Sequence, residues 1–496
     1  MPTVEGCLEL RHQTRHHGVA GAQRESPRTL MANYTKRASA SLLGALCAVA
    51  VVVGLLPAAA QQDPNPVMIT VEGGGWGHGV GMSQYGAFGR AARGDSHADI
   101  LDFYYPGSNL TTVEDFDDIR IHIHSAQGTV INPVNAPSGS AADDNEIVDG
   151  DVHHIFEHRN GTPLTVDKNR GGFSITRPNS SGTRNLCIDD EGDDRCRVDE
   201  LRFRFQQGNP IHVDAINRVS IGTDGNAYQW GELVVSERAQ APNKTLWVVL
   251  EGLTLDQYIY GLAEVPSSWP SATLQAQSVA ARTYGYDRAT TRRATSNWEW
   301  PWDLYSTVND QVYHGLSKEI GEFGPAWVAA VDATSNQVLL YDGDPITAFY
   351  SSSNGGWTEE SGYVFVTQLP YLPAKRDNRD SYQNPYATWR RDYTGDEVGR
   401  WFTNSSVGGV GMVTDVIVSG NIGESGRVDR ATVTVIGLNG TLEGSGNTFR
   451  NVINAGVARE GGGLSRQVLS TNDTVSVWGA EDPVGALEKG HRRKSA

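Results

Sequence analysis

The sequence predicts a β-rich α+β protein, and three observations support this fold class. Glycine is abundant, with 56 in 496 residues, which favours turns and shaped loops. Short runs of alternating apolar and polar residues, the pattern of half-buried strands, recur along the chain. Stretches with helical periodicity are few. The length is enough for one large domain or two ordinary ones.

The first 60 residues are predicted to be an export signal. Lys36 and Arg37 precede an uncharged apolar stretch, 41–57, and the small residues 58–60 follow it, which is the order of a cleavable signal peptide. Met31 would begin a signal of normal length, so we expect 1–30 to be an over-extended gene start. The apolar stretch is short for a spanning helix of about 20 residues. We therefore expect cleavage and a secreted or cell-wall-associated chain, with an uncleaved membrane anchor as the alternative.

The remaining chain is strongly acidic. After the six basic and three acidic side chains of residues 1–60 are removed, 35 basic and 55 acidic side chains remain, a formal charge of about −20. This balance excludes nucleic acid as a partner, because phosphate binding needs a basic surface. A glycan with little charge is compatible. Cys187 and Cys196 flank an acidic turn, and in an exported chain they predict a disulfide rather than a metal site.

The N-terminal half is predicted to be mostly strands. A strand is expected over 67–71, followed by a helix over 82–92 with Ser83 as its cap and a second helix over 98–105. From 112 to 224 the chain alternates between apolar and polar residues and predicts an all-β insert or accessory region. Its clearest strands are expected at 119–123, 201–205 and 211–213.

The C-terminal half mixes the two element types. The clearest helix is 270–286, where apolar residues recur at helical spacing. A hairpin is expected around Asp342-Gly-Asp-Pro345, with strands 337–341 and 346–350. The other expected elements are paired strands over 231–237 and 245–250, a helical turn over 255–262 and a helix over 326–333.

Two segments carry the most specific motifs. One is Gly73-Gly-Gly-Trp-Gly-His-Gly-Val-Gly-Met-Ser-Gln-Tyr-Gly86, and the other is Ala263-Glu-Val-Pro-Ser-Ser-Trp-Pro270, which runs into Ala276-Gln-Ser-Val-Ala-Ala-Arg-Thr-Tyr284. Together they resemble the SpoIID/LytB family, stage II sporulation protein D and its relatives. In the usual family order the Glu-containing segment comes first. Here the order is reversed, so the resemblance implies a circular permutation in which the two segments meet in space.

The resemblance also implies a domain organisation. It covers roughly 67–111 and 228–459, with no repeats elsewhere. The expected parts are the signal 1–60, the permuted Gly-His-Gly segment 61–111, the β-rich accessory or insert region 112–224, the main SpoIID-like domain 225–460 and a polar tail 461–496.

The resemblance implies that Glu264 is the catalytic acid of a peptidoglycan lytic transglycosylase. Leu262, Val265 and Trp269 surround it with apolar groups, and burial among such groups raises the pKa of a carboxyl towards neutral pH. The carboxyl would protonate the glycosidic oxygen and then accept the proton of the C6 hydroxyl, leaving a 1,6-anhydro-muramyl end. In the structural alternative, Glu264 caps the following helix or pairs with Arg282.

Other residues are candidates for sugar binding. His78 is a candidate sugar-binding residue, and the alternative is a structural role for this histidine in a tight turn. Trp298, Trp300 and Trp302 are expected to anchor a loop on the core rather than stack on sugars. Some family members carry a cysteine pair before the stretch Gln311-Val-Tyr-His-Gly315. This chain has none there, so no structural zinc is expected. The candidate substrate-binding residues are His78, Ser83, Gln84, Arg282, Tyr284 and Ser352.

The leading functional hypothesis is that the protein is an exported lytic transglycosylase, which cleaves MurNAc–GlcNAc strands in cell-wall remodelling or sporulation. The alternative is a non-catalytic glycan-binding protein that stimulates a cell-wall amidase. A third reading is a secreted structural module that binds no glycan. The expected partners are therefore peptidoglycan glycan strands and, in the alternative, an amidase. No cofactor and no metal are expected, and a membrane contact is expected only if the signal is uncleaved.

Overall fold

In the computed structural model of the protein, all described residues lie within the segment Asp63–Ala496. Helices and strands are intermixed along the chain, which confirms the α+β fold class. The predicted signal peptide with Met31 and the predicted Cys187–Cys196 disulfide lie outside the described residues. The structure describes residues 66–114, 116, 118–126, 128–133, 146–149, 152–155, 164–169, 172–179, 182–185, 199–204, 211–216, 227–237, 246–295 and 300–478.

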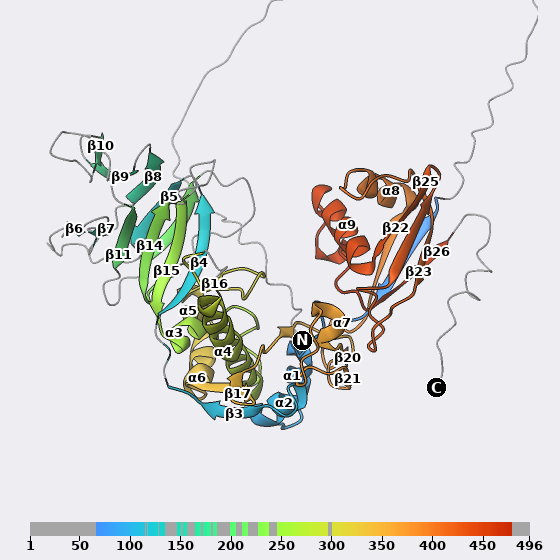
Figure 1. The fold of residues 1–496 in the computed structure, drawn as a ribbon, viewed down its shortest axis with the longest axis horizontal. Coiled ribbons are helices and arrows are strands. Elements are labelled where there is room, and N and C mark those ends of the chain that lie inside the picture. The colour runs from blue at the N-terminus through green and yellow to red at the C-terminus, as the bar shows by residue number, and fades with distance from the viewer. Residues whose placement is uncertain are drawn as a thin grey trace, which may run out of the picture. The chain divides into compact units, whose positions relative to one another are not determined.

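Two large sheets contain most strands between residues 119 and 253 (Figure 1). In the seven-stranded sheet, β4 and β11 pair with β15 and β14, so the region predicted as an insert shares a sheet with the predicted main domain. In sheet order, its strands are β16 (Leu304–Tyr305), β4 (Ile119–Ala126), β15 (Leu246–Leu253), β14 (Glu232–Glu237), β11 (Glu200–Arg204), β7 (Val152–Ile155) and β6 (Glu146–Asp149). The six-stranded sheet has the order β10 (Gly182–Asn185), β9 (Gly172–Asn179), β8 (Leu164–Asn169), β5 (Gly128–Pro133), β12 (Ile211–Ile216) and β13 (Ala227–Tyr228).

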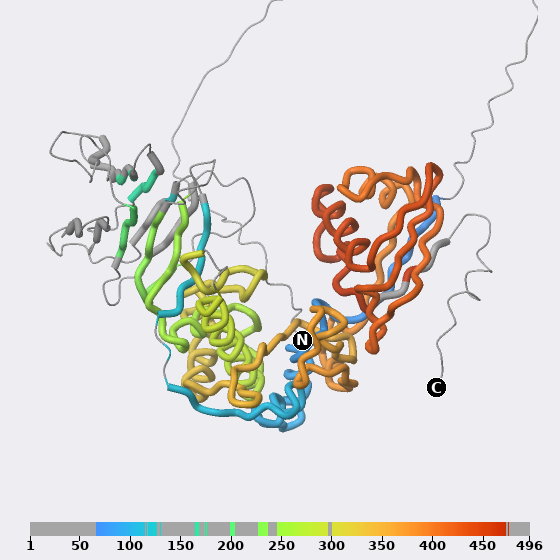
Figure 2. Tube along the Cα trace, in the orientation of Figure 1, coloured from blue at the N-terminus to red at the C-terminus, as the bar shows by residue number. Residues whose placement is uncertain are grey.

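A three-stranded sheet joins distant parts of the sequence. Its central strand, β1 (Met68–Gly73), pairs antiparallel with β22 (Trp389–Thr394) and β26 (Asp473–Trp478), and Figure 2 shows this N-terminal strand running beside β22 from the C-terminal half of the chain. The predicted polar tail 461–496 therefore begins too early, because Val468 and Leu469 are buried in the core and β26 completes this sheet. The same core packs against β23 (Val413–Ser419), β24 (Thr432–Gly437), β25 (Gly440–Ser445), α8 (Gly395–Thr403), α9 (Gly446–Arg459) and the 3-10 helix η2 (Leu464–Arg466).

The longest helix, α4 (Ser271–Ala294), runs eight residues beyond its predicted end. It has Pro270 as its N-cap and no side-chain cap, and its buried face includes Ala276, Val279 and Ala280. The helices α1 and α2 from the N-terminal segment pack against it, as do α3 and α6. These four helices are α1 (Gln84–Ala91), α2 (His97–Tyr104), α3 (Leu255–Tyr260) and α6 (Gly324–Asp332). The other two helices of this part of the structure are α5 (Leu316–Ile320), which packs on α3 and α6, and α7 (Ser361–Phe365).

The remaining strands are short. The predicted hairpin forms around Asp342 and Gly343, both at positive φ, but its second strand is only Asp344–Pro345. Beyond it, the Ile346 amide still donates to the Leu339 carbonyl at 3.1 Å, and Ile346 and Ala348 are buried. These strands form three small sheets: β18 (Asp344–Pro345), β17 (Gln337–Tyr341) and β3 (Asn109–Thr112); β19 (Tyr350–Ser351) and β2 (Met82–Ser83); β20 (Trp357–Thr358) and β21 (Lys375–Arg376).

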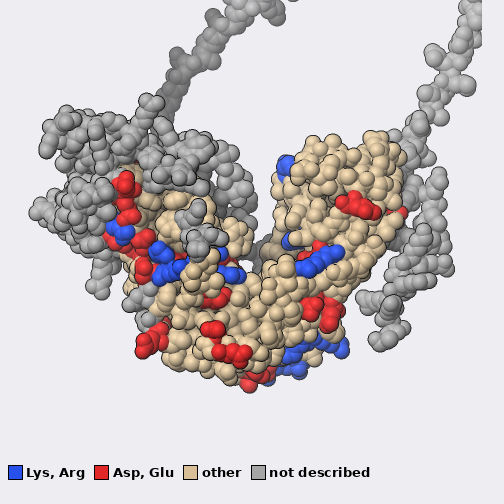
Figure 3. Space-filling view, viewed as in Figure 1, with Lys and Arg blue, Asp and Glu red and all other residues tan. Residues whose placement is uncertain are grey.

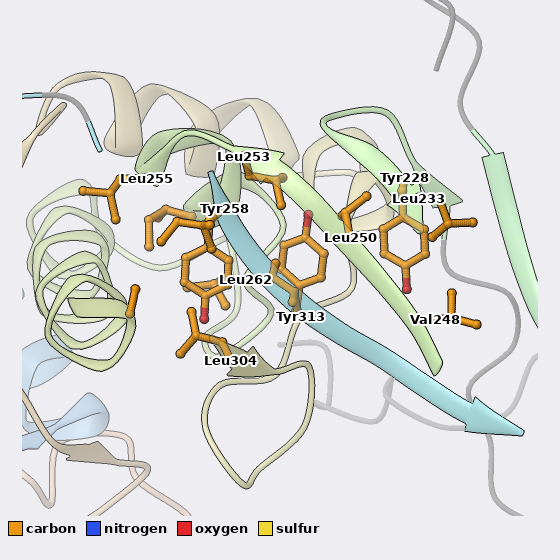
Figure 4. Close-up of a cluster of buried hydrophobic side chains, with 14 of the residues drawn as sticks. Tyr228, Leu233, Val248, Leu250, Leu253, Leu255, Tyr258, Leu262, Leu304 and Tyr313 are labelled. Carbon is orange, nitrogen blue, oxygen red and sulfur yellow. The ribbon is translucent and has the colours of Figure 1, made fainter. Parts of the chain in front are cut away.

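A buried aromatic layer supports the loop that follows α3 (Figure 4). The ring of Tyr313 lies parallel to those of Tyr258 and Tyr228, with centroids 5.7 Å and 6.0 Å away. Leu262 packs into the same cluster. Stacked rings of this kind contribute beyond their buried area, so the layer gives residues 261–264 a rigid floor.

Candidate functional site

Glu264 lies in a short loop between α3 and α4 that is fixed by main-chain hydrogen bonds. The amide of Ala263 donates to the Val312 carbonyl at 2.9 Å, and the amide of His314 donates to the Gly261 carbonyl at 2.8 Å. The Glu264 carboxylate itself accepts a hydrogen bond from the Val312 amide, at 2.6 Å. The side chain therefore has one defined position at the end of an antiparallel pairing.

The electrostatic environment of Glu264 favours proton exchange near neutral pH. Burial raises the pKa of Glu264 from its ordinary 4.5 to about 7, while the Val312 amide, the charge of Lys318 and a hydrogen bond with Gln84 each act to lower it. Lys318 is held by the Val265 carbonyl, 2.6 Å from its Nζ. Burial lowers the pKa of Lys318 to about 8, and the Glu264 charge opposes that change. Glu264 neither caps α4 nor pairs with Arg282.

The glycine segment owes its shape to alternate residues at positive φ. Gly75, Gly77, Gly79 and Gly81 have φ values of 82°, 104°, 73° and 70°, a region that other residues rarely adopt. Space is also tight: a Cβ on Gly81 would lie 2.0 Å from the Phe349 carbonyl oxygen. This density of glycine is therefore required by the path of the loop.

The glycine segment, residues 73–86, lies along residues 349–353, which follow β18 and include three consecutive serines. The amide of Trp76 donates to the Ser353 carbonyl at 2.8 Å, and the amide of Met82 donates to the Phe349 carbonyl at 3.1 Å. The Gly79 amide donates to the Ser351 hydroxyl at 3.2 Å. Two segments about 270 residues apart thus form one wall.

Direct contacts join this wall to the Glu264 loop. The ring of Trp269 stacks on Phe88 of α1, with centroids 5.0 Å apart and planes at 9°, and meets Tyr85 edge-on at 5.1 Å. Gln84 donates to Gln277 of α4 at 3.4 Å. The two motif-bearing segments therefore meet in space.

A pocket of about 540 Å³ opens between them. Its described lining comes from the glycine segment, the Glu264 loop, α4, the 308–312 loop and residues 349–352, with Phe365 at one side. Val308 and Phe365, which are 87% and 39% exposed, give the pocket apolar edges. A pocket with an acid, amide groups and aromatic faces is suited to a sugar chain.

Five of the seven candidate residues line this pocket: Glu264, His78, Gln84, Tyr284 and Ser352. The other two do not. Ser83 is the N-cap of α1, and its hydroxyl is used by the Gly86 amide and by Asp380. Arg282 is fully buried and pairs with Asp256 at 2.7 Å. Neither residue is among the described lining of the pocket, and the polar groups of both already have internal partners, so we correct both assignments.

His78 is a neutral member of the pocket wall. Burial lowers the pKa of His78 to about 4, and the charge of Arg427 acts in the same direction. Its Nδ1 accepts a hydrogen bond from the Val80 amide at 3.0 Å, and its ring meets those of Phe349 and Phe365 edge-on. It combines a structural contact within its loop with a face towards the pocket.

Sequence reasoning missed the second carboxylate of the pocket, Asp310. One oxygen accepts from the Tyr284 hydroxyl at 3.0 Å, and the other from the Tyr305 amide at 2.8 Å. Arg292 bridges both oxygens at 2.9 and 2.7 Å. Lys318 and Val312 were also missed. The stretch Gln311–Gly315 was the available signal, because it directly follows Asp310 and holds Val312.

The described residues contain no group of three His, Cys, Asp or Glu that could hold a metal ion. Among them there is also no helix of the length and apolarity that a bilayer crossing requires. Basic and acidic side chains are interspersed over the coloured part of the surface in Figure 3. Trp302 is buried against the rings of Trp300 and Trp247, whereas Trp298 lies outside the described residues.

Comparison with known proteins covers the central part of the chain. The family model SpoIID, described as stage II sporulation protein, matches residues 243–341. The amidase enhancer of Bacillus subtilis is 41% identical over 117 residues, 24% of this chain and 14% of that protein. Stage II sporulation protein D of the same organism is 27% identical over 150 residues, 28% of this chain and 42% of that protein. The chain thus spans less than half the length of these relatives.

Proposed function

Because this chain belongs to the SpoIID family through residues 243–341, we propose that it is an exported peptidoglycan lytic transglycosylase with Glu264 as its acid and base. The observation that supports this most is the place of Glu264. Burial raises the pKa of this carboxyl to about 7, and the side chain is held at one point of a pocket lined by both motif-bearing segments.

The proposed reaction uses Glu264 twice. The protonated carboxyl donates its proton to the glycosidic oxygen as the bond from that oxygen to C1 of MurNAc breaks. The carboxylate then accepts the proton of the C6 hydroxyl as that oxygen bonds to C1. The products are a 1,6-anhydro-muramyl end and a free GlcNAc 4-hydroxyl, and the acid is regenerated. No water or second nucleophile is consumed.

The groups around Glu264 suit this cycle. Burial favours the protonated acid at the start. The Val312 amide, Lys318 and Gln84 stabilise the carboxylate that forms once the proton has left. Since these opposing effects bring the pKa of Glu264 near neutral, proton transfer to and from this carboxyl has a low free-energy cost at neutral pH.

Asp310 supports a one-carboxylate mechanism. Ordinary glycosidases use two carboxyl groups, one as acid and one as base or nucleophile. Among the described residues, Asp310 is the other acid that lines this pocket, but Arg292, Tyr284 and Tyr305 occupy both of its oxygens. It is thereby suited to orienting Tyr284 rather than to attacking a sugar or activating water.

The test compares the wild-type chain with Glu264→Gln on purified glycan strands, with mass spectrometry of the products. We expect 1,6-anhydro ends from wild type and a loss of about 10²–10⁴-fold in the variant. Glu251→Gln is the matched control, because burial also raises the pKa of Glu251 to about 7 but it pairs with Arg202 away from the pocket. Reducing ends in place of anhydro ends would refute the transglycosylase chemistry.

The similarity to the amidase enhancer favours a second candidate function, a non-catalytic glycan-binding protein that stimulates a cell-wall amidase. In that case neither wild type nor Glu264→Gln cleaves glycan, and both raise the rate of a purified amidase on cell walls. Stimulation that is equal in the two proteins would assign the pocket to binding alone.

A further inference from the structure

A second cavity adjoins the Glu264 pocket. It has a volume of about 650 Å³ and shares the lining residues Gly77, His78 and Phe365 with the first. A ligand that fills the first pocket and extends past His78 enters the second. Its other lining residues include Asp429, Arg430, Ser445, Asn447, Arg450 and Thr471.

The second cavity is locally cationic. Arg430 is exposed and forms no ion pair with any residue that the structure describes, its guanidinium lying 6.0 Å from the Tyr363 ring centroid. Arg450 is fixed by the Val468 and Leu469 carbonyls, at 3.0 and 3.2 Å. The single acid among the lining residues is Asp429, which accepts a hydrogen bond from Thr471. Two arginines and one aspartate thus line this cavity, in a chain with a formal charge of −17.

The first main-chain amides of α9, at the edge of this cavity, already have acceptors within the protein. Ser445 is the N-cap of α9, but the Gly446 amide already donates to the Ala431 carbonyl and the Asn447 amide to the Asp429 carbonyl. The hydroxyl of Ser445 accepts from the Thr448 amide. The guanidinium of Arg430, which has no ion-pair partner among the described residues, is therefore a donor available to a ligand, and Arg450 lines the same cavity. A planar guanidinium matches a carboxylate with two parallel hydrogen bonds.

We propose that this cavity is a carboxylate subsite of the glycan cleft, with Arg430 as its principal ligand. The inference rests on the proposed function, since the carboxylate belongs to the glycan that reaches Glu264. Peptidoglycan supplies that group from two sources. One is the lactyl carboxylate of muramic acid, which is free only after the stem peptide has been removed. The other is a carboxylate of the stem peptide itself.

The experiment measures the binding of Glu264→Gln, which keeps the ligand intact, with and without Arg430→Gln. The ligands are stripped glycan strands, strands with stem peptides, and chito-oligosaccharide of matched length, which has no carboxylate. Arg400→Gln is the control, because Arg400 is an exposed arginine of α8 with one surface partner, Glu460. We expect Arg430→Gln to weaken binding of one carboxylate ligand about tenfold or more, as loss of a charge-assisted hydrogen bond predicts, and to leave chito-oligosaccharide binding unchanged.

The outcomes separate the sources and the two proposals. A loss with stripped strands assigns the lactyl carboxylate, and a loss only with peptide-bearing strands assigns the stem. Equal binding of all carboxylate ligands by both proteins overturns the subsite and leaves the glycan cleft standing. Failure of the parent protein to bind any of the three ligands overturns the cleft and the subsite together.

Discussion

Replacing Glu264 by glutamine is expected to stabilise the protein at neutral pH while it removes cleavage. A carboxyl whose pKa is raised in the folded state holds a proton that the unfolded chain has already lost. Stability therefore falls as pH rises from the unfolded pKa to the folded one. For Glu264 these limits are 4.5 and about 7. Glutamine does not ionise, so the variant escapes this loss, and its Oε1 can still accept from the Val312 amide.

The size of the effect follows from the two pKa values. A displacement from 4.5 to about 7, at about 1.4 kcal/mol per pH unit, corresponds to about 3 kcal/mol in full, of which about 2 kcal/mol develops between pH 5 and 7.5. The free energy of unfolding of both proteins is measured by urea denaturation at these two pH values. The difference, variant minus wild type, should grow by about 2 kcal/mol on going to pH 7.5. A difference that is the same at both pH values would show that the folded protein does not raise the pKa of this carboxyl.

Three further perturbations test other parts of the structure. In a pH profile of kcat/KM, cleavage should fall above pH about 7 as Glu264 ionises. Lys318→Met removes a charge that lowers the pKa of Glu264, so the fall should move up by about one pH unit. An unchanged profile would contradict the coupling between Lys318 and Glu264. Arg282→Ala leaves Asp256 without its buried partner and should cost about 3–5 kcal/mol in urea denaturation; a cost below about 1 kcal/mol would refute the structural role. Gly81→Ala should lower the free energy of unfolding by more than about 2 kcal/mol, because the new Cβ combines a strained φ with a contact to the Phe349 carbonyl oxygen. Gly94 also has a positive φ but lies in open space, so Gly94→Ala should cost about half as much or less.

Sequence reasoning located the pocket but not the roles of all its residues. The motif around Glu264 and the glycine segment were sufficient to predict that the two meet, and their contacts through Trp269 and Gln84 meet that expectation. Ser83 shows the limit of the approach. It was expected both to cap a helix and to bind sugar, and the hydroxyl that accepts from the Gly86 amide and binds Asp380 is not available for a ligand.

The residues that were missed are those without a pattern in the sequence. Lys318 reaches Glu264 only because α5 follows a strand-like pairing between Leu262 and Tyr313, and no spacing rule relates a lysine to an acid 54 positions away. The prediction ended α4 too early for a similar reason. Its last turns lack apolar periodicity, and Arg292 and Arg293 are held by Asp310 and Asp303, which are tertiary partners.

The sheet β22–β1–β26 makes the described chain almost a ring. Met68 at the start of β1 stands opposite Trp478 at the end of β26 in antiparallel register, so a turn of a few residues would join them as a hairpin. A cut in the connection 113–118, between β3 and β4, would then reopen the ring with its contacts retained. The rewired gene would encode the Glu264 segment ahead of the glycine segment. Both gene orders would therefore specify the same assembled pocket, and order along the chain is a matter of where the ring is opened.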